Sequence, residues 1–284
     1  LYPLLAKLCT MIGFHPLIAL ILISNLALLG ALKIFLEEVS EYFDESIMLP
    51  AGLALLVFPG AFFFYAPYPM SLALLLVLLS VRFTRKNKWL AASLTGFLSG
   101  LTHSTVIPLS LLLLLFGLTD LPKTNGKLRW ISLLTSAMPL AGVVTFLAWR
   151  IHQGFPSMAN MLDASWGSTL LNPLKAIEQL GQSILMGNWM SLLKTGIILV
   201  GLFSIYWLFR QRKITLAIYQ AGLLLYLVSF TVPDHPLGSF IRYFLLSFPV
   251  YMTLGAWMKQ KTKLRVLVFS GMGILNLFLC SLFM

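Results

Sequence analysis

Arg242 is the side chain in this sequence best suited to binding an anion. It stands beside Tyr243 in SFIRYFLLSF, a lone arginine at the start of an apolar stretch. A planar guanidinium matches the oxygens of a phosphate, so Arg242, with Tyr243 beside it, is a candidate for binding a phosphate. The alternative is an arginine that only extends its charged head to the aqueous interface from a helix end.

Two aspartates are candidates for a general base that takes a proton from a substrate hydroxyl. Asp234, in VPDHP, is the carboxylate nearest to Arg242 along the chain, and Asp163 lies in LDASWG. Asp234 has two other interpretations, as the ion partner of Arg242 or as a residue that shapes a proline-flanked turn. Both aspartates therefore stay open as candidates for one role.

His103, in THST, lies where two short apolar segments meet. It can contact a sugar or a phosphate, and the alternative is a neutral histidine whose hydrogen bonds only support the fold. The chain has four histidines, and no two of them have the i, i+4 spacing of a helical zinc site. We therefore expect no metal and no other cofactor.

Four more residues are candidates for lining a binding cavity. Tyr68 and Ser71 belong to FYAPYPMS, whose prolines predict a tight hairpin that brings both side chains to a cavity rim. Trp166 can stack on a sugar ring, or it can be an interfacial aromatic residue. Asn25 lies well inside an apolar segment, where an interhelical hydrogen bond is the alternative to a cavity contact.

The elements that must position these residues are membrane helices. Of the 284 residues, 59% are hydrophobic and 10% are charged, and apolar segments follow one another along the whole chain. We therefore expect an all-α, polytopic helical membrane protein with one transmembrane domain over residues 1–284. About ten spans are predicted, several of them short: 16–36, 48–64, 69–82, 89–102, 105–119, 131–149, 189–208, 214–231, 241–258 and 266–284.

The net charge of +11 is distributed as short basic runs between these spans. The runs at 82–88, 123–129, 210–213 and 259–265 all fall on one side, which is therefore predicted to be cytoplasmic, with both chain ends outside. A nucleic-acid surface would be contiguous, so nucleic acid is not an expected partner. The acidic stretch EEVSEYFDE, residues 37–45, is the exception, because it is predicted to be a cytoplasmic loop.

The opposite, outer side gathers the polar residues with chemical potential. The outer loop 150–188 is the longest in the chain, and its apolar spacing predicts an amphipathic helix along the membrane surface, with Pro173 in the first turn. The same side holds His15, His103, His152, His235, Asp163, Glu178, Asp234 and Arg242. An enzyme or transporter that works from the extracytoplasmic face would have this distribution.

Four segments in order resemble the PIG-V-like mannosyltransferases. The stretch from FPGAFFFYAPYPMS to GLTHST resembles the family's signature region, and LYPLLAKL with LILISNLALL, ASWGS and SFIRYFLLSFPVY resemble three further segments. The resemblance implies a GT-C-type membrane glycosyltransferase of the GPI mannosyltransferase II-like kind. It implies a polyprenyl- or dolichyl-phosphate sugar donor, a glycolipid or glycan acceptor and contact with membrane lipid. The membrane would be the plasma membrane in a prokaryote and the endoplasmic reticulum in a eukaryote.

The chain departs from the family pattern at several positions. Met70 stands where the family has an acidic residue, His103 stands in place of an arginine, and Ser168 in place of another. The family's catalytic aspartate precedes the region with which this sequence begins, so we expect the N-terminal part to be missing. Two alternatives therefore remain, a non-catalytic or truncated relative that binds lipid or a partner subunit, and a transporter or flippase. No internal repeat favours the transporter.

Overall fold

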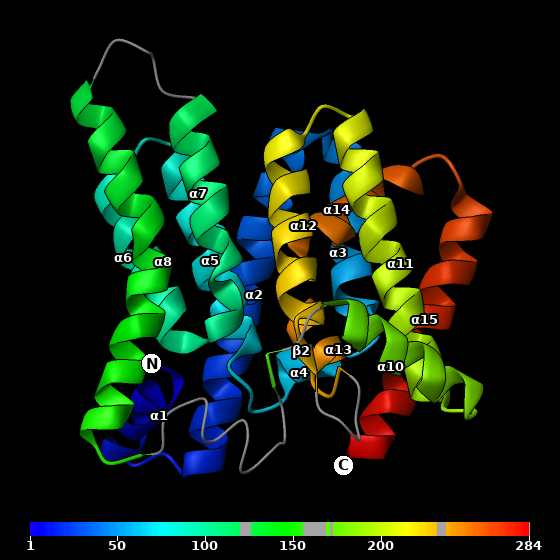
Figure 1. The fold of residues 1–284 in the computed structure, drawn as a ribbon, viewed down its shortest axis with the longest axis horizontal. Coiled ribbons are helices and arrows are strands. Elements are labelled where there is room, and N and C mark those ends of the chain that lie inside the picture. The colour runs from blue at the N-terminus through cyan, green and yellow to red at the C-terminus, as the bar shows by residue number, and fades with distance from the viewer. Residues whose placement is uncertain (120–125, 156–168, 171–172, 232–236, 284) are drawn as a thin grey trace.

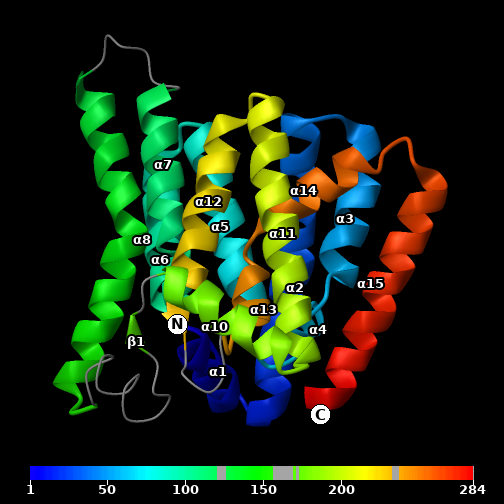
Figure 2. The ribbon, with the colours of Figure 1, turned by 45° about the vertical axis from the view of Figure 1, so that its right-hand side comes forward.

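Helices make up nearly all of the computed structural model, which describes residues 1–119, 126–155, 169–170, 173–231 and 237–283. The long helices stand roughly parallel in both views (Figures 1 and 2). The end of the bundle that contains α1, α4, α10 and α13 is called the lower end, and the opposite end is the upper end. The helices are α1 Tyr2–Met11, α2 Pro16–Tyr42, α3 Met48–Val57, α4 Phe62–Tyr65, α5 Met70–Arg85, α6 Trp89–Thr102, α7 Pro108–Thr119, α8 Gly126–His152, α10 Pro173–Leu185, α11 Trp189–Arg210, α12 Ile214–Val228, α13 Phe240–Phe244, α14 Phe248–Trp257 and α15 Thr262–Phe283, with short 3-10 turns at Glu45–Ile47 and Ser104–Val106.

In the part of the chain that the structure describes, four helices are long and apolar enough to cross a membrane: Pro16–Tyr42, Trp130–His152, Trp189–Arg210 and Thr262–Leu282. Four shorter apolar helices accompany them. The prediction of a helical membrane protein is therefore confirmed, while the prediction of about ten spans stays a prediction. The two-residue strands Thr169–Leu170 (β1) and Phe230–Thr231 (β2) pair antiparallel beside the bundle's lower end.

Two predicted spans are broken in the structure. The predicted span 48–64 ends as α3 at Val57, and a turn through Gly60 leads into the short α4. Gly60 has φ +88°, and a Cβ added there would lie 2.6 Å from Ile241 of α13, so this turn packs closely on α13. The predicted span 241–258 divides into α13 and α14. Both breaks lie toward the lower end of the bundle (Figure 1).

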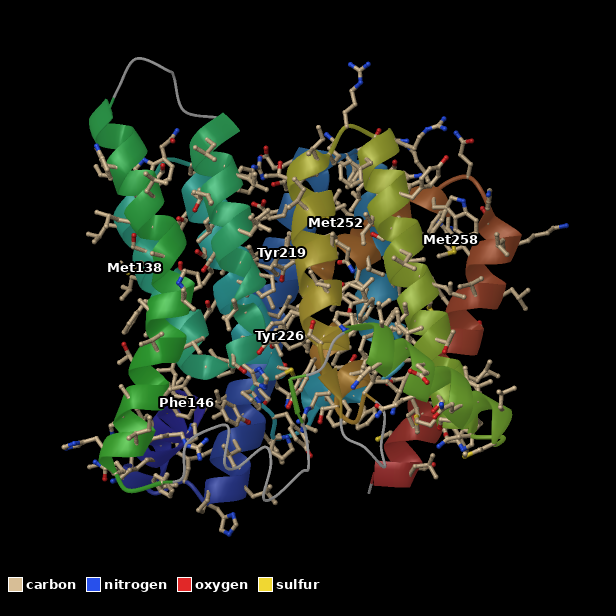
Figure 3. All side chains as sticks on the ribbon, in the orientation of Figure 1. Met138, Phe146, Tyr219, Tyr226, Met252 and Met258 are labelled. Carbon is tan, nitrogen blue, oxygen red and sulfur yellow. The ribbon has the colours of Figure 1, made fainter. Side chains whose placement is uncertain are left out.

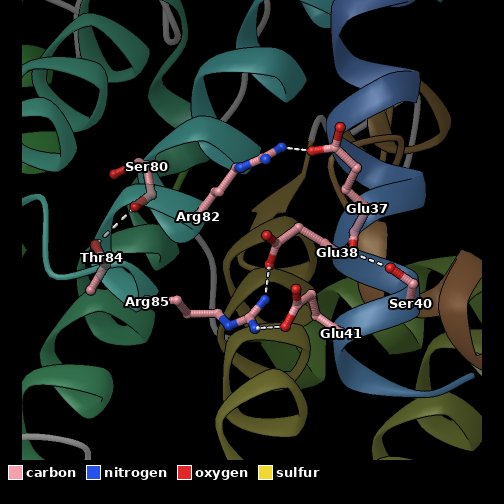
Figure 4. Close-up of polar contacts among 8 residues, drawn as sticks. All are labelled: Glu37, Glu38, Ser40, Glu41, Ser80, Arg82, Thr84 and Arg85. Carbon is pink, nitrogen blue, oxygen red and sulfur yellow. Dashed lines mark hydrogen bonds and ion pairs between the residues drawn. The ribbon is translucent and has the colours of Figure 1, made fainter.

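The acidic stretch 37–45 is not a loop over most of its length, because α2 continues to Tyr42. Its carboxylates meet the basic end of α5: Arg85 donates to Glu38 at 2.7 Å and to Glu41 at 2.9 Å, and Arg82 pairs with Glu37 (Figure 4). The charge pattern predicts these acids and bases on one side of the membrane, and the structure adds that they pair with one another. Their mutual neutralisation explains why an acidic stretch lies among basic turns.

Close backbone contact joins α6 to α8. A Cβ added at Gly100 would lie 2.1 Å from the carbonyl oxygen of Pro139, and one added at Gly142 would lie 2.1 Å from that of Phe97. Small residues at a helix interface allow such an approach, which is a common way for membrane helices to associate. The contact holds the lower end of α6, and with it His103, against the long helix α8.

Candidate functional site

The short helix α13 carries Arg242, and the break that follows it is fixed by buried tyrosines. The hydroxyl of Tyr219 donates to the carbonyl of Leu246 at 3.0 Å, and that of Tyr251 donates to the carbonyl of Leu245 at 3.1 Å. The two hydroxyls thus bind carbonyls in the irregular segment between the helices, where the Leu246 carbonyl also accepts from the backbone N–H of Phe248 at 2.9 Å. Figure 3 shows Tyr219 on α12, in the middle of the bundle. The break between α13 and α14 is therefore built into the core.

Arg242 is half-buried and surrounded by aromatic rings. Its guanidinium carbon lies 4.8 Å from the ring centroid of Tyr243, 5.3 Å from that of Tyr68 and 5.8 Å from that of Phe63. It donates to the hydroxyl of Tyr243 at 2.9 Å and to the hydroxyl of Ser239 at 3.3 Å. Ring faces attract a cation and position the guanidinium without neutralising its charge. Arg242 therefore keeps a positive charge that an anionic ligand can use.

The hairpin FYAPYPMS brings Tyr68 to this arginine. Ser71 donates to the carbonyl of Phe64 at 2.5 Å, and Asn25 donates to the carbonyl of Tyr65 at 3.2 Å. These two side chains satisfy backbone groups that the prolines leave outside regular helices. Ser71 and Asn25 thus hold the hairpin in place. The alternative interpretation of Asn25, an interhelical hydrogen bond, agrees with this geometry.

His103 ends α6 and packs against Tyr243. Its Nδ1 accepts from the backbone N–H of Thr105 at 3.3 Å and contacts the Thr105 hydroxyl at 2.9 Å. The ring centroids of His103 and Tyr243 lie 4.8 Å apart. Burial and the neighbouring charge of Arg242 lower the pKa of His103 to about 4. The imidazole is therefore neutral at pH 7, as the alternative interpretation of this residue requires, and it supports the tyrosine that binds Arg242.

A cavity of about 130 Å³ lies in front of Arg242. Its lining consists of Phe62, Phe63, Tyr68, Met190, Lys194, Gly238, Ser239, Ile241, Arg242 and Leu279. Lys194, in the second turn of α11, is 7% exposed and is the second cation of this lining. Among the described residues that line the cavity, none is acidic. The arrangement favours a small anion.

A larger, mostly apolar cavity of about 640 Å³ lies on another side of the same hairpin. Pro67 and Pro69, the neighbours of Tyr68, line it together with residues of α1, Leu101 at the end of α6 and Phe146 of α8. Figure 3 shows Phe146 low on α8, close to α1. The hairpin thus separates a small cationic cavity from a large apolar one, which suits a ligand with an anionic head and a hydrocarbon tail.

The predicted site residues divide into three groups. Arg242, Tyr243, Tyr68 and His103 lie together at the lower end of the bundle, whereas Ser71 and Asn25 support the hairpin beside them. The remaining three, Asp234, Asp163 and Trp166, lie outside the described residues. No group of three His, Cys, Asp or Glu side chains that could hold a metal occurs in the described part of the chain.

Lys194 is the cavity residue that the sequence analysis did not select. The signal was available, because a single lysine lies inside the otherwise apolar helix α11. A cation within a membrane helix is costly unless it faces protein or a polar cavity, and such residues are commonly functional. Lys194 and Arg242 are 48 positions apart in the sequence, so the sequence alone did not show that both line one cavity.

The helix α10 covers part of the lower end of the bundle. It begins at Pro173, and Figure 2 shows it running across the lower ends of α12 and α11. Ala176 and Leu180 are buried, whereas Leu174 and Ile177 on its other side are 71% and 56% exposed. The predicted amphipathic helix therefore exists, and its exposed apolar side chains suit contact with lipid.

Comparison with protein-family models, with curated proteins and with solved structures finds no match for this chain. The resemblance to the mannosyltransferases therefore depends on the sequence motifs alone.

Proposed function

We propose that the protein is a multi-pass membrane glycosyltransferase of the GT-C type, a mannosyltransferase that uses a polyprenyl- or dolichyl-phosphate sugar. The observation that carries the proposal is the position of Arg242, which lies in a small cavity with a second cation, beside a hairpin that also borders a large apolar cavity. A lipid-linked phosphate has the matching anionic head and apolar tail.

Each residue of the site has a separate role in such a transfer. Arg242 binds the phosphate, Tyr68 and Tyr243 orient the guanidinium, and neutral His103 supports Tyr243. As the sugar C1–O bond breaks, its electron pair stays on the phosphate oxygen, while the acceptor hydroxyl oxygen forms the new bond to C1. The hydroxyl proton passes to a carboxylate, for which Asp234 and Asp163 remain candidates outside the described residues.

A second candidate is a non-catalytic protein that binds the same lipid phosphate. The observation in its favour is that no described residue lining the cationic cavity is acidic. A membrane protein of this kind would hold the lipid through Arg242 and transfer no sugar. Transfer of radiolabelled mannose from a polyprenyl-phosphate mannose to a glycolipid or glycan acceptor that is separated from the donor by chromatography distinguishes the two candidates, because only the enzyme catalyses it.

The proposal predicts that Arg242→Gln weakens binding of a polyprenyl-phosphate mannose at least about tenfold, the effect of losing a charged hydrogen bond of about 1.4 kcal/mol or more. Binding is measured on purified protein in lipid nanodiscs. Arg150→Gln serves as the matched control, since Arg150 lies at the end of α8 and is not among the residues that line the cationic cavity. Unchanged affinity in Arg242→Gln would refute the assignment of the phosphate to this arginine.

A further inference from the structure

The second cation of the small cavity, Lys194, has no role in the proposal so far. It lies one turn after Met190, and both side chains line the cavity, so they share one face of α11. Asn188 fixes the start of this helix, because its side chain accepts from the backbone N–H groups of Met190 and Ser191 at 3.0 and 3.3 Å. The position of Lys194 is therefore set by a capped and rigid turn.

Neighbouring helices hold this turn in place. The hydroxyl of Ser191 donates to that of Ser183 on α10 at 2.8 Å. From the other side, Asn276 of α15 accepts from the backbone N–H of Phe62, another residue of the cavity lining, at 3.1 Å. The two cations thus come from separate elements, α11 and α13, and line the same cavity.

Charge distinguishes the ligands that such a cavity can hold. A phosphodiester, such as a lipid-phosphate sugar, carries one negative charge, whereas a phosphate monoester carries about −1.5 to −2 at pH 7. Two cations that line about 130 Å³ match the monoester better than the diester. The volume equals that of about four water molecules, which is enough for a phosphate group.

We infer that Lys194 and Arg242 together form a two-cation site that selects a phosphate monoester, so that the protein binds free polyprenyl phosphate more tightly than the intact sugar donor. This inference rests on the proposed function. It adds a ligand preference and a binding residue, and it implies that the released lipid phosphate competes with fresh donor until it leaves the site.

The test compares two probes, polyprenyl phosphate and polyprenyl-phosphate mannose, on the purified protein in nanodiscs. The unaltered protein should bind polyprenyl phosphate about tenfold more tightly or better. Lys194→Met keeps the apolar stem and removes the charge, and it should weaken polyprenyl phosphate binding at least about tenfold and donor binding less than about threefold. Lys175→Met, on the exposed face of α10, is the matched control and should change neither affinity.

Lys194→Arg is a second variant that retains the charge and should retain the preference for the monoester. An equal loss of both affinities in Lys194→Met overturns the two-cation inference and leaves the proposed function standing. Binding of neither probe by the unaltered protein overturns the proposed function itself. Displacement of polyprenyl phosphate by an equal concentration of inorganic phosphate would show that the site recognises a free anion, against the inference.

Discussion

The neutral state of His103 makes a prediction about how stability depends on pH. His103 lies between α6 and the turn Ser104–Val106, and burial together with the charge of Arg242 lowers the pKa of its ring from 6.5 to about 4. The folded protein therefore binds this proton less readily than the unfolded chain does. The resulting stability is fully present above about pH 6.5 and is lost as the pH falls toward 4.

The size of the effect follows from the two pKa values. With 6.5 in the unfolded chain and about 4 in the folded protein, lowering the pH from 8 to 5 costs about 2 kcal/mol of the free energy of unfolding. For a chain of this length that corresponds to a decrease of about 4 °C in the melting temperature. Arg242 is the charged group that the proton would meet, and Tyr243 is the ring packed against the imidazole.

The variant His103→Asn isolates this contribution. An asparagine oxygen can accept from the backbone N–H of Thr105 as Nδ1 does, so the turn keeps its cap without a titratable ring. Melting temperatures are measured in detergent by size-exclusion chromatography after heating, at pH 8 and pH 5. The unaltered protein should lose about 4 °C more than the variant between these two values.

A matched control separates this histidine from the rest of the chain. His15 is exposed at the start of α2 and makes no side-chain capping hydrogen bond, so His15→Asn should keep the full pH dependence of the unaltered protein. If His103→Asn loses as much stability between pH 8 and pH 5 as the unaltered protein does, His103 is not the source of this pH dependence. The assignment of a neutral His103 beside the charge of Arg242 would then be wrong.

Two further predictions concern the packing that holds the site. Gly100→Ala places a Cβ 2.1 Å from a carbonyl oxygen of α8 and should lower the free energy of unfolding by about 1–3 kcal/mol. Gly196→Ala is the control and should leave it unchanged, because a Cβ there has no neighbouring atom within 4 Å. Equal stability of the two variants would contradict the close contact between α6 and α8. Arg85→Met leaves Glu38, which is 3% exposed, without its ion partner and should lower the free energy of unfolding by about 2 kcal/mol. Arg82→Met should cost less, because its partner Glu37 is 37% exposed. A larger loss in Arg82→Met than in Arg85→Met would refute the importance of the buried pair.

The sequence determined the class of the protein and much of its helical pattern. Apolar segments of sufficient length specify helices because backbone groups in lipid must be paired within the segment. The predicted bounds of α6, 89–102, agree with those of the structure, and the proline-rich hairpin before α5 occurs where expected. The acidic stretch 37–45 was misassigned to a loop: α2 continues to Tyr42, and the partners of its carboxylates on α5 become evident only in the tertiary structure.

The assembly of the site was decided only by the tertiary structure. Arg242 and Tyr243 are neighbours in sequence, but Tyr68, His103 and Lys194 reach them from three other elements. Sequence motifs indicated Arg242, Tyr243, Tyr68 and His103. Lys194 was not selected, because periodicity shows which face of a helix a residue occupies but not which residues of other elements lie opposite that face. At the two helix breaks at this end, the hydroxyl of Tyr219 donates to the carbonyl of Leu246, and the side-chain oxygen of Asn276 accepts from the backbone N–H of Phe62. These contacts join residues far apart in the sequence, so no local pattern contains them.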